Sequence, residues 1–164
     1  MNFENSKLAG SPHHFLARLA GGWTGTTKLW IESDVLADES PVQGSIQLVL
    51  DGRFALYLYQ GSVEGKPQHG IFTFGYNTQL KRYEASWVDG WHNNTAIMFC
   101  TGDAMENGFQ VSGSYPDPSS GPDWGWRTEV ILEDINHLTI TAYNISPAGS
   151  EAKATESKLT RIRK

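Results

Sequence analysis

Hydrophobic and polar residues along the chain repeat with two different periods, and the period changes near the N-terminus. Apolar residues at spacings of three and four predict a short amphipathic helix over residues 11–20. Ser11-Pro12 is a start signal, because Ser can cap free N–H groups and Pro suits the first helical position. Gly21-Gly22 ends the helix, and from Trp23 onward the period is two, as in strands. The apolar stripe consists of Phe15, Leu16, Leu19 and Ala20.

Ten segments with strand-like patterns follow, separated by turn residues. No gap between them is long enough for a crossover helix, so neighbouring strands should pair antiparallel. One open sheet of ten strands would leave two exposed edges, and closing the sheet removes both. The predicted strands are residues 23–32, 43–50, 53–60, 68–76, 80–88, 91–100, 109–115, 124–133, 137–145 and 151–161.

This pattern predicts an all-β fold, a closed antiparallel up-and-down barrel of about ten strands that occupies residues 23–162. The short N-terminal helix would lie across one open end, and the chain would form a single domain over residues 1–164. Two alternatives stay open: a two-sheet sandwich, and an ordinary helix packed on a sheet. Residues 1–10 are expected to form a loose leader, and residues 33–41 an acidic loop across one mouth of the barrel.

The turn at Asp89-Gly90 decides which side chains are expected inside the barrel. Asp-Gly between apolar runs is typical of a two-residue hairpin, and Asp51-Gly52 has the same pattern. With two residues in the loop, Trp87 pairs with His92, and one face of this strand pair carries no charged residue. That face, with the alternation in other strands, predicts an aromatic interior with a few polar groups. The candidate lining residues are Phe72, Phe74, Tyr76, Tyr83, Trp87, His92, Asn94, Met98, Trp126, Thr128 and Asn144.

Net charge and cysteine content limit the partners and the cellular location that are expected for the protein. The net charge of -5 argues against nucleic acid or an anionic membrane as a partner, because both favour a basic surface. The single cysteine, Cys100, cannot form an internal disulfide. The first residues lack the apolar core of a secretory signal, and no apolar run approaches the length of about 20 residues that spans a bilayer. We therefore expect a cytoplasmic protein in a reducing compartment.

No sequence motif marks a catalytic, metal or nucleotide site. The five histidines form no metal-ligand spacing, and one cysteine cannot build a thiolate cluster. The chain has no glycine-rich phosphate loop and no Gly-x-Ser-x-Gly nucleophile motif. We therefore predict no catalytic residue set, no bound metal and no cofactor.

One short stretch resembles a known barrel class. Gly21-Gly22-Trp23 is similar to the Gly-x-Trp signature at the first strand of lipocalins and other calycins. In those barrels the tryptophan closes the base, and an arginine near the last strand packs across it. The resemblance implies these two roles for Trp23 and Arg161.

A longer resemblance runs from about His14 to Arg161. Six stretches are similar to a bacterial family known only as a domain of unknown function, number fifteen seventy-nine. The resemblance implies a lipocalin-like barrel and no established activity, so no functional residue carries over from it. The stretches are LAGGWTGTTKLW, SPVQGSIQLVLDGRFALYLYQGS, PQHGIFTFGYNT, RYEASWVDGWHNNTAIMFC, GSYPDPSSGPDWGWRTEV and LTITAYNISPAGSEAKATES.

Several functions stay open at this point. The pattern of apolar walls with a few polar groups favours a cavity for a small, largely apolar ligand, although a packed aromatic core looks the same. An enzyme would use His92 as a base on a small molecule inside the barrel. Haem could be held by His92 or His137, by similarity to small bacterial barrel proteins that bind haem through one histidine. A homodimer would use exposed aromatic residues such as Trp30 and Trp91 as its interface.

Overall fold

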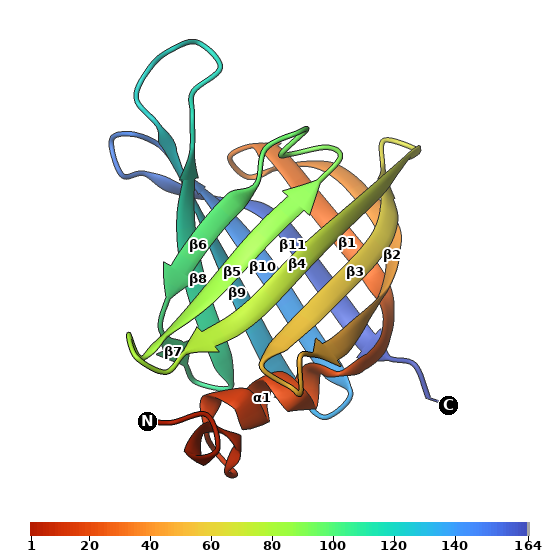
Figure 1. Ribbon diagram of the computed structural model, residues 1–164. Helices are drawn as coiled ribbons and strands as arrows, with labels where there is room; N and C mark the ends of the chain where they lie inside the picture. Colours follow the sequence, from red (N-terminus) through yellow and green to blue (C-terminus); the bar gives the residue numbers. More distant parts are fainter. Residues whose placement is uncertain (164) are drawn as a thin grey trace.

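A barrel of antiparallel strands with one short α-helix across an end makes up the computed structural model (Figure 1). The structure describes residues 1–163, so Lys164 of the predicted domain lies outside the described residues. We call the end covered by the helix the lower end and the opposite end the upper end. The helices are η1 (Asn5–Lys7) and α1 (Pro12–Leu19). The strands are β1 (Gly21–Glu32), β2 (Val35–Val49), β3 (Phe54–Val63), β4 (Lys66–Asn77), β5 (Arg82–Asp89), β6 (Met98–Gly102), β7 (Ala104–Met105), β8 (Gly108–Tyr115), β9 (Trp124–Asp134), β10 (His137–Ile145) and β11 (Glu151–Arg161).

Two seams close the barrel. β1 pairs with β2 on one side and with β11 on the other, so the first and last strands are neighbours. The opposite seam joins β6 to β8 through the pair of Thr101 and Ser112. The strand order runs without a break between these seams, so ten strands form the barrel and β7 is one extra strand. The predicted closed barrel is confirmed, and the sandwich alternative is wrong.

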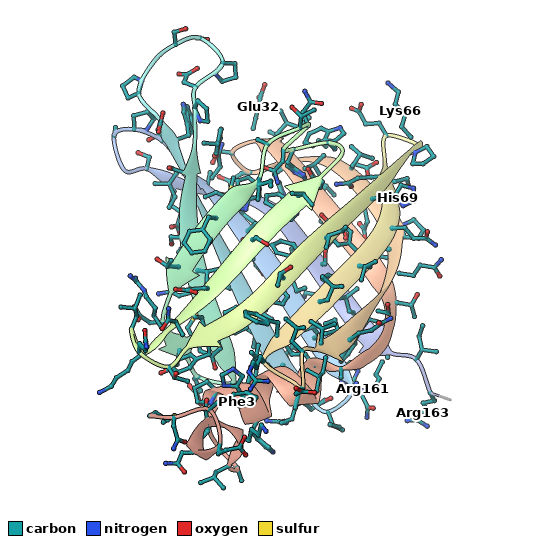
Figure 2. The ribbon with its side chains drawn as sticks, in the orientation of Figure 1. Phe3, Glu32, Lys66, His69, Arg161 and Arg163 are labelled. Carbon is teal, nitrogen blue, oxygen red and sulfur yellow. The ribbon has the colours of Figure 1, made fainter. Side chains whose placement is uncertain are left out.

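Trp23 and Arg161 close the lower end, as the resemblance to calycins implies. Trp23 has no exposed surface, and its indole Nε1 donates to the carbonyl of Leu19 at the end of α1 (2.9 Å). Arg161 is the β11 partner of Trp23, and its guanidinium carbon lies 4.2 Å from the centre of the Trp23 ring. The guanidinium also donates to the carbonyl of Arg18 (2.8 Å), which joins β11 to the helix. Figure 2 shows Arg161 beside α1, at the opposite end from Glu32.

The helix forms as predicted, with small corrections around it. Leu16 and Leu19 are fully buried beneath the barrel, and α1 contacts β2, β3 and β4. Ser11 occupies the N-cap position without a capping hydrogen bond from its side chain. Residues 1–10 are not a loose leader, because they contain η1 and the buried Ser6 hydroxyl bonds to His13 Nδ1 (2.6 Å). No helix among residues 1–163 is long and apolar enough to cross a membrane.

β2 begins earlier than the sequence predicts, so the acidic loop at residues 33–41 is wrong. The turn after β1 is tight, with Asp34 at a positive φ of 62°, and the chain then pairs with β1, including Lys28 with Glu39. Pairing with the long β1 holds these residues in a strand despite the low strand propensity of acidic side chains. Asp38 consequently becomes part of the barrel wall.

The turn at Asp51-Gly52 is also longer than predicted. Val49 pairs with Phe54, so four residues connect β2 to β3, and Leu50 is one of those with a positive φ. The alternation of faces continues across the turn, and Tyr57 of β3 faces the interior.

The Asp89-Gly90 pair does not form a two-residue hairpin either. β5 pairs with β6 through Trp87 and Met98, which leaves residues 90–97 as a loop at the upper end. The predicted pairing of Trp87 with His92 is therefore wrong, and the strand predicted before Met98 is absent. The faces of the two strands are nevertheless as predicted, because the pairing is shifted by an even number of residues.

Gly25 is expected to be indispensable for the seam between β1 and β11. A Cβ at Gly25 would lie 1.9 Å from the backbone oxygen of Lys158, so an alanine there would push the two strands apart. We expect Gly25→Ala to lower the free energy of unfolding by about 2 kcal/mol or more, measured by urea denaturation. Gly90→Ala is the control, because a Cβ at Gly90 meets no atom within 4 Å. Equal stability of the two variants would show that the seam tolerates a side chain.

Candidate functional site

The lower half of the barrel interior is filled with side chains. Trp23, Phe74 and Phe109 have no exposed surface. The Phe109 ring stacks on Tyr83 with ring centres 4.3 Å apart, and Phe15 of α1 packs edge-on against it. In the described residues, the space inside the barrel therefore lies in the upper half.

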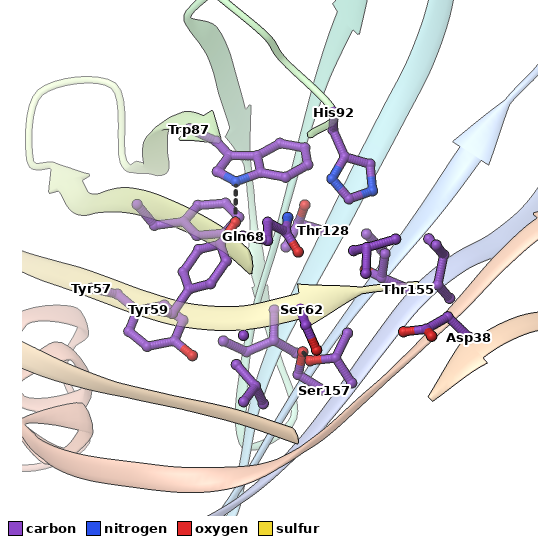
Figure 3. A pocket seen from close by; sticks show the side chains of 18 of the residues that line it. Asp38, Tyr57, Tyr59, Ser62, Gln68, Trp87, His92, Thr128, Thr155 and Ser157 are labelled. Carbon is purple, nitrogen blue, oxygen red and sulfur yellow. Dashed lines mark hydrogen bonds between the residues drawn. The ribbon is translucent and has the colours of Figure 1, made fainter. Parts of the chain in front are cut away.

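A cavity of about 60 Å³, which we call the inner cavity, lies inside the upper half of the barrel (Figure 3). One part of its wall is aromatic, and another carries hydroxyl and carboxyl groups. The cavity admits a few water molecules or a small chemical group, since one water needs roughly 10–15 Å³ of such space. The aromatic residues are Tyr57, Tyr59, Phe72, Trp87 and Trp126, and the polar residues are Thr27, Asp38, Ser62, Gln68, His92, Thr128, Thr155 and Ser157.

A second cavity of about 260 Å³, which we call the outer cavity, adjoins the inner one. The two cavities share four side chains, so these form the boundary between them: Leu29, Trp87, His92 and Trp126. The outer cavity is completed by β1, by the loop of residues 90–97 and by the upper parts of β6, β8, β10 and β11. Its other lining residues are Trp30, Ile31, Trp91, Asn93, Met98, Tyr115, Asn144 and Ala154.

The buried carboxylate of Asp89 holds the imidazole of His92 in place. One Asp89 oxygen accepts the backbone N–H groups of His92 (2.6 Å) and Asn93 (2.8 Å). The other accepts from His92 Nδ1 (2.6 Å) and Gln68 Nε2 (2.9 Å). Burial raises the pKa of the Asp89 carboxyl, but the bonds and charge of His92 and the two N–H groups outweigh it, so this pKa lies below its usual value. Beside the ionised Asp89 carboxylate, the neutral form of the imidazole carries its proton on Nδ1, and in that form Nε2 is an acceptor.

Three buried polar atoms in this region have no hydrogen-bond partner within residues 1–163. They are His92 Nε2, Trp126 Nε1 and Thr128 Oγ1. Trp126 and Thr128 are two residues apart on β9 and so share a face, and the His92 and Trp126 ring centres are 5.5 Å apart. A fourth such atom, Arg82 Nε, belongs to the first residue of β5 and lines neither cavity. Leaving a buried polar group unbonded costs about 1–3 kcal/mol, so three such atoms in one place require an explanation.

Comparison with known proteins identifies the family. Residues 9–161 match the family described as Protein of unknown function (DUF1579). The chain belongs to this family. No curated protein matches the chain.

Two solved structures share the barrel of this DUF1579 protein. The crystal structure of Rv2717c from M. tuberculosis has a TM-score of 0.60 and 14% sequence identity, over 93% of this chain and 99% of that chain. The S-type phycobiliprotein lyase CPES from Guillardia theta has a TM-score of 0.62 and 12% identity, over 100% of this chain and 99% of that chain. At these identities the likeness shows the fold alone.

The lining residues predicted from the sequence of this DUF1579 protein fall into four groups. The inner cavity is lined by Phe72, Trp87, His92, Trp126 and Thr128, and the outer cavity also by Met98 and Asn144. Packing residues below the cavities are Phe74, Tyr76 and Tyr83. Asn94 is a wrong prediction, because the loop of residues 90–97 replaces the expected strand and leaves Asn94 exposed. Its neighbour Asn93 is buried instead and donates to the carbonyl of Trp87 (3.3 Å).

Several residues of the site are absent from the prediction. Tyr57 and Tyr59 line the inner cavity, and their alternation in β3 is a signal that would have placed both inside. The role of Asp89 could not be predicted, because Asp-Gly in the sequence favours a simple turn. Asp38 lies in an acidic segment that has the composition of a loop, so the sequence gives no signal for it.

The structure does not offer haem a fitting site. His137 is exposed at the lower end, where its Nδ1 bonds to Asp134 (2.7 Å), and it lines neither cavity. His92 has an unbonded Nε2 and lines both cavities, but these measure about 60 Å³ and about 260 Å³, and each is below the roughly 300 Å³ at which pockets for larger ligands begin. Within the described chain, no group of three or more His, Cys, Asp or Glu side chains is placed to hold a metal ion.

The thiol of Cys100 has no place in the site chemistry. Burial raises the pKa of Cys100 to about 11, so the thiol is protonated and unreactive near neutral pH. Its side chain packs in the core beside β8, where Gly113 lies close to its sulfur.

Proposed function

We propose that the protein binds a small, largely apolar molecule with one polar group in the upper half of the barrel. The observation that carries this proposal is the set of unbonded atoms on the cavity wall, His92 Nε2, Trp126 Nε1 and Thr128 Oγ1. Stability alone favours apolar or fully bonded side chains at buried positions. A ligand that supplies the missing hydrogen bonds explains why these polar groups are present.

The walls suit the apolar body of such a ligand. The Phe72 and Trp87 rings are parallel within 1°, with centres 5.2 Å apart, and Trp126 lies 5.2 Å beyond Trp87. Flat apolar groups pack favourably on aromatic surfaces of this kind. Since the inner cavity takes only a few atoms, the ligand body would occupy the outer cavity, with its polar end at the boundary.

The cellular location and the partners of the protein are part of the same proposal. A cytoplasmic location fits the single Cys100, which is a free and buried thiol. The net charge of -5 favours a small neutral partner over nucleic acid. A homodimer through Trp30 and Trp91 stays a prediction, and size measurement in solution tests it.

Native mass spectrometry of the purified protein tests the binding proposal directly. We expect a fraction of the protein to carry a co-bound small molecule, which is released when the protein is unfolded. A control sample, unfolded and refolded after removal of small molecules, should lack the added mass and should regain it from a cell extract. Protein that carries no added mass in either state, before or after exposure to the extract, would contradict the proposal.

Thr128→Val separates a binding role from a structural one. Valine has nearly the shape of threonine without the unbonded hydroxyl, so the ligand-free protein should gain about 1 kcal/mol in free energy of unfolding. The co-bound fraction should fall by about tenfold, because one hydrogen bond to the ligand is lost. Urea denaturation and native mass spectrometry measure the two effects.

Thr139→Val is the matched control for this change. Thr139 lies on the outer side of β10 and donates to Glu133 Oε1 (2.6 Å), and it lines neither cavity. It should leave the co-bound fraction unchanged. If Thr128→Val were less stable than the parent and bound the ligand as well, Thr128 would be an ordinary structural residue.

A second candidate function is proton transfer with His92 as general base. The contact of Asp89 with His92 Nδ1 at 2.6 Å favours it, because an oriented imidazole with a free Nε2 beside a cavity is the arrangement that such a base requires. Nε2 would take a proton from the bound molecule, and the imidazolium, stabilised by Asp89, would return it to another atom of the same molecule. Incubation of the co-purified molecule in heavy water tests this, since catalysis would exchange a carbon-bound hydrogen and His92→Gln would stop the exchange. Equal exchange with and without the protein would contradict proton transfer, and binding would remain as the only proposed function.

A further inference from the structure

We infer that the polar group of the ligand is a neutral hydroxyl carried on a flat apolar body, as in a phenol. This inference rests on the proposed function, because it names the chemistry of the molecule bound at the same site. Its basis is the hydrogen-bonding roles of His92 and Trp126 at the boundary between the two cavities and of Thr128 in the inner cavity, together with the charges that surround them.

The three unbonded atoms have complementary roles. Trp126 Nε1 can only donate, and Thr128 Oγ1 can donate or accept. His92 Nε2 accepts as long as the imidazole is neutral, since Nδ1 keeps its proton toward Asp89. A hydroxyl oxygen accepts from Trp126 or Thr128 while its own proton is donated to His92. One O–H group therefore gives His92 a donor and gives Trp126 or Thr128 an acceptor, whereas an ether or ketone has no proton for His92 and an ammonium has no lone pair for Trp126.

The surrounding charges argue against an anionic ligand. Asp89 of β5 bonds to His92, and the other titratable side chains that line the cavities with it are Asp38 of β2, Tyr57 and Tyr59 of β3, and Tyr115 of β8. Two of these are carboxylates, and none of the described residues that line either cavity is Lys or Arg. A ligand carboxylate would need a protonated His92 and would lie near both carboxylates without a balancing cation.

The shape of the space favours a flat body. The outer cavity of about 260 Å³ begins at the Trp87, His92 and Trp126 side chains and reaches Trp91 and Asn93 in the loop of residues 90–97. Trp87 and Trp126 present stacked indole rings there, with planes 25° apart. An aromatic ring carrying the hydroxyl would lie against these indoles and place its oxygen between His92 and Trp126.

Titration calorimetry with three probes of similar size tests the inference: phenol, toluene and benzoate. Phenol and toluene differ mainly in the O–H group, and benzoate carries a negative charge. We expect phenol to bind about tenfold more tightly than toluene, because toluene leaves the polar atoms unbonded. We expect benzoate to bind more weakly than phenol. Repeating the phenol titration in two buffers of different ionisation enthalpy should show no net proton uptake, because the phenol O–H group itself supplies the hydrogen for the bond to His92 Nε2.

Two variants locate the effect. Trp126→Phe removes the donor and His92→Phe removes the acceptor, and each should bring the affinity for phenol down to about that for toluene. The affinity for toluene itself should change little. His137→Phe, at the exposed lower end, is the control and should leave both affinities unchanged. If circular dichroism shows that one of these two variants does not fold, Thr128→Val is measured in its place.

Each outcome has one meaning. Toluene binding as tightly as phenol would overturn the hydroxyl inference and leave the proposed binding function intact. Benzoate binding more tightly than phenol, with uptake of a proton, would overturn it in favour of an anion site. Failure of all three probes would overturn the hydroxyl inference, while the co-bound mass in native spectra decides the proposed function separately.

Discussion

Replacing Trp23 with alanine is expected to lower the free energy of unfolding by about 4 kcal/mol. The side chain is fully buried at the lower end, and its removal leaves a large void there. It also leaves the carbonyl of Leu19 without its donor and removes the ring beneath the Arg161 guanidinium. Guanidinium chloride denaturation followed by circular dichroism measures the loss.

Trp91→Ala is the control for the loss of a tryptophan as such. Trp91 lies in the loop of residues 90–97 and is 43% exposed, so its replacement should change stability far less. Trp23→Phe should fall between the two, because it refills most of the void and still lacks the N–H donor. If Trp23→Ala and Trp91→Ala lost equal stability, the closure of the lower end would not depend on Trp23.

Asp89→Asn should cost about 3 kcal/mol, because the carboxylate is the common acceptor of four hydrogen bonds in a fully buried position. An amide nitrogen cannot accept, so at least the donors on one side, His92 Nδ1 and Gln68 Nε2 or the two backbone N–H groups, lose their partner. The loop of residues 90–97 should loosen, and ligand binding should fall with it because His92 is no longer oriented. Urea denaturation and the phenol titration measure these effects.

Asp134→Asn is a matched control for Asp89→Asn. Asp134 makes the same kind of contact, to His137 Nδ1 three residues later (2.7 Å) and to the backbone N–H of Asn136 (2.7 Å), but on the exposed surface. Water replaces these bonds when they are lost, so the effect of Asp134→Asn should be much smaller. Equal losses from the two variants would mean that burial of Asp89 does not strengthen its bonds.

The stability gap between the parent and Asp89→Asn should also depend on pH. The pKa of Asp89 is lower in the folded protein than the ordinary value of 3.8. Ionisation of Asp89 therefore stabilises the fold above that ordinary value, and the contribution is lost as the pH falls through the folded-state pKa. The gap should narrow as the pH falls below about 4. A gap that widens in acid would show that Asp89 is protonated in the fold.

Closure and the inward faces could be predicted from the sequence, because both depend on a period-two pattern that survives shifts in pairing. Trp87 and Met98 share a face in the structure as predicted, although they pair six positions away from the expected register. The position of Trp23 could be predicted as well, since Gly21-Gly22 marks the junction of helix and strand.

The loop of residues 90–97 could not be predicted, and with it the contact by which Asp89 holds His92. Asp-Gly is a local turn signal, whereas Asp89 uses its side chain to bind backbone N–H groups three and four residues later. Nothing in the sequence distinguishes an Asp-Gly turn from an Asp side chain that binds backbone N–H groups. Whether the polar atoms of Trp126 and Thr128 have hydrogen-bond partners depends on all of their neighbours in the fold, so the sequence alone does not show that they lack one. Asp38 likewise enters the wall through its pairing with β1 and not through its own propensity.

The indole N–H signal of Trp126 in a proton–nitrogen correlation NMR spectrum gives the most direct test of a ligand site at the cavity boundary. Comparison with the Trp126→Phe variant identifies this signal among those of the six tryptophans. When phenol or the co-purified molecule is added, we predict that the Trp126 signal moves downfield as its N–H gains an acceptor. The Trp23 signal should stay in place, because its N–H already donates to Leu19. A Trp126 signal that does not move when the protein is saturated with ligand would contradict the site.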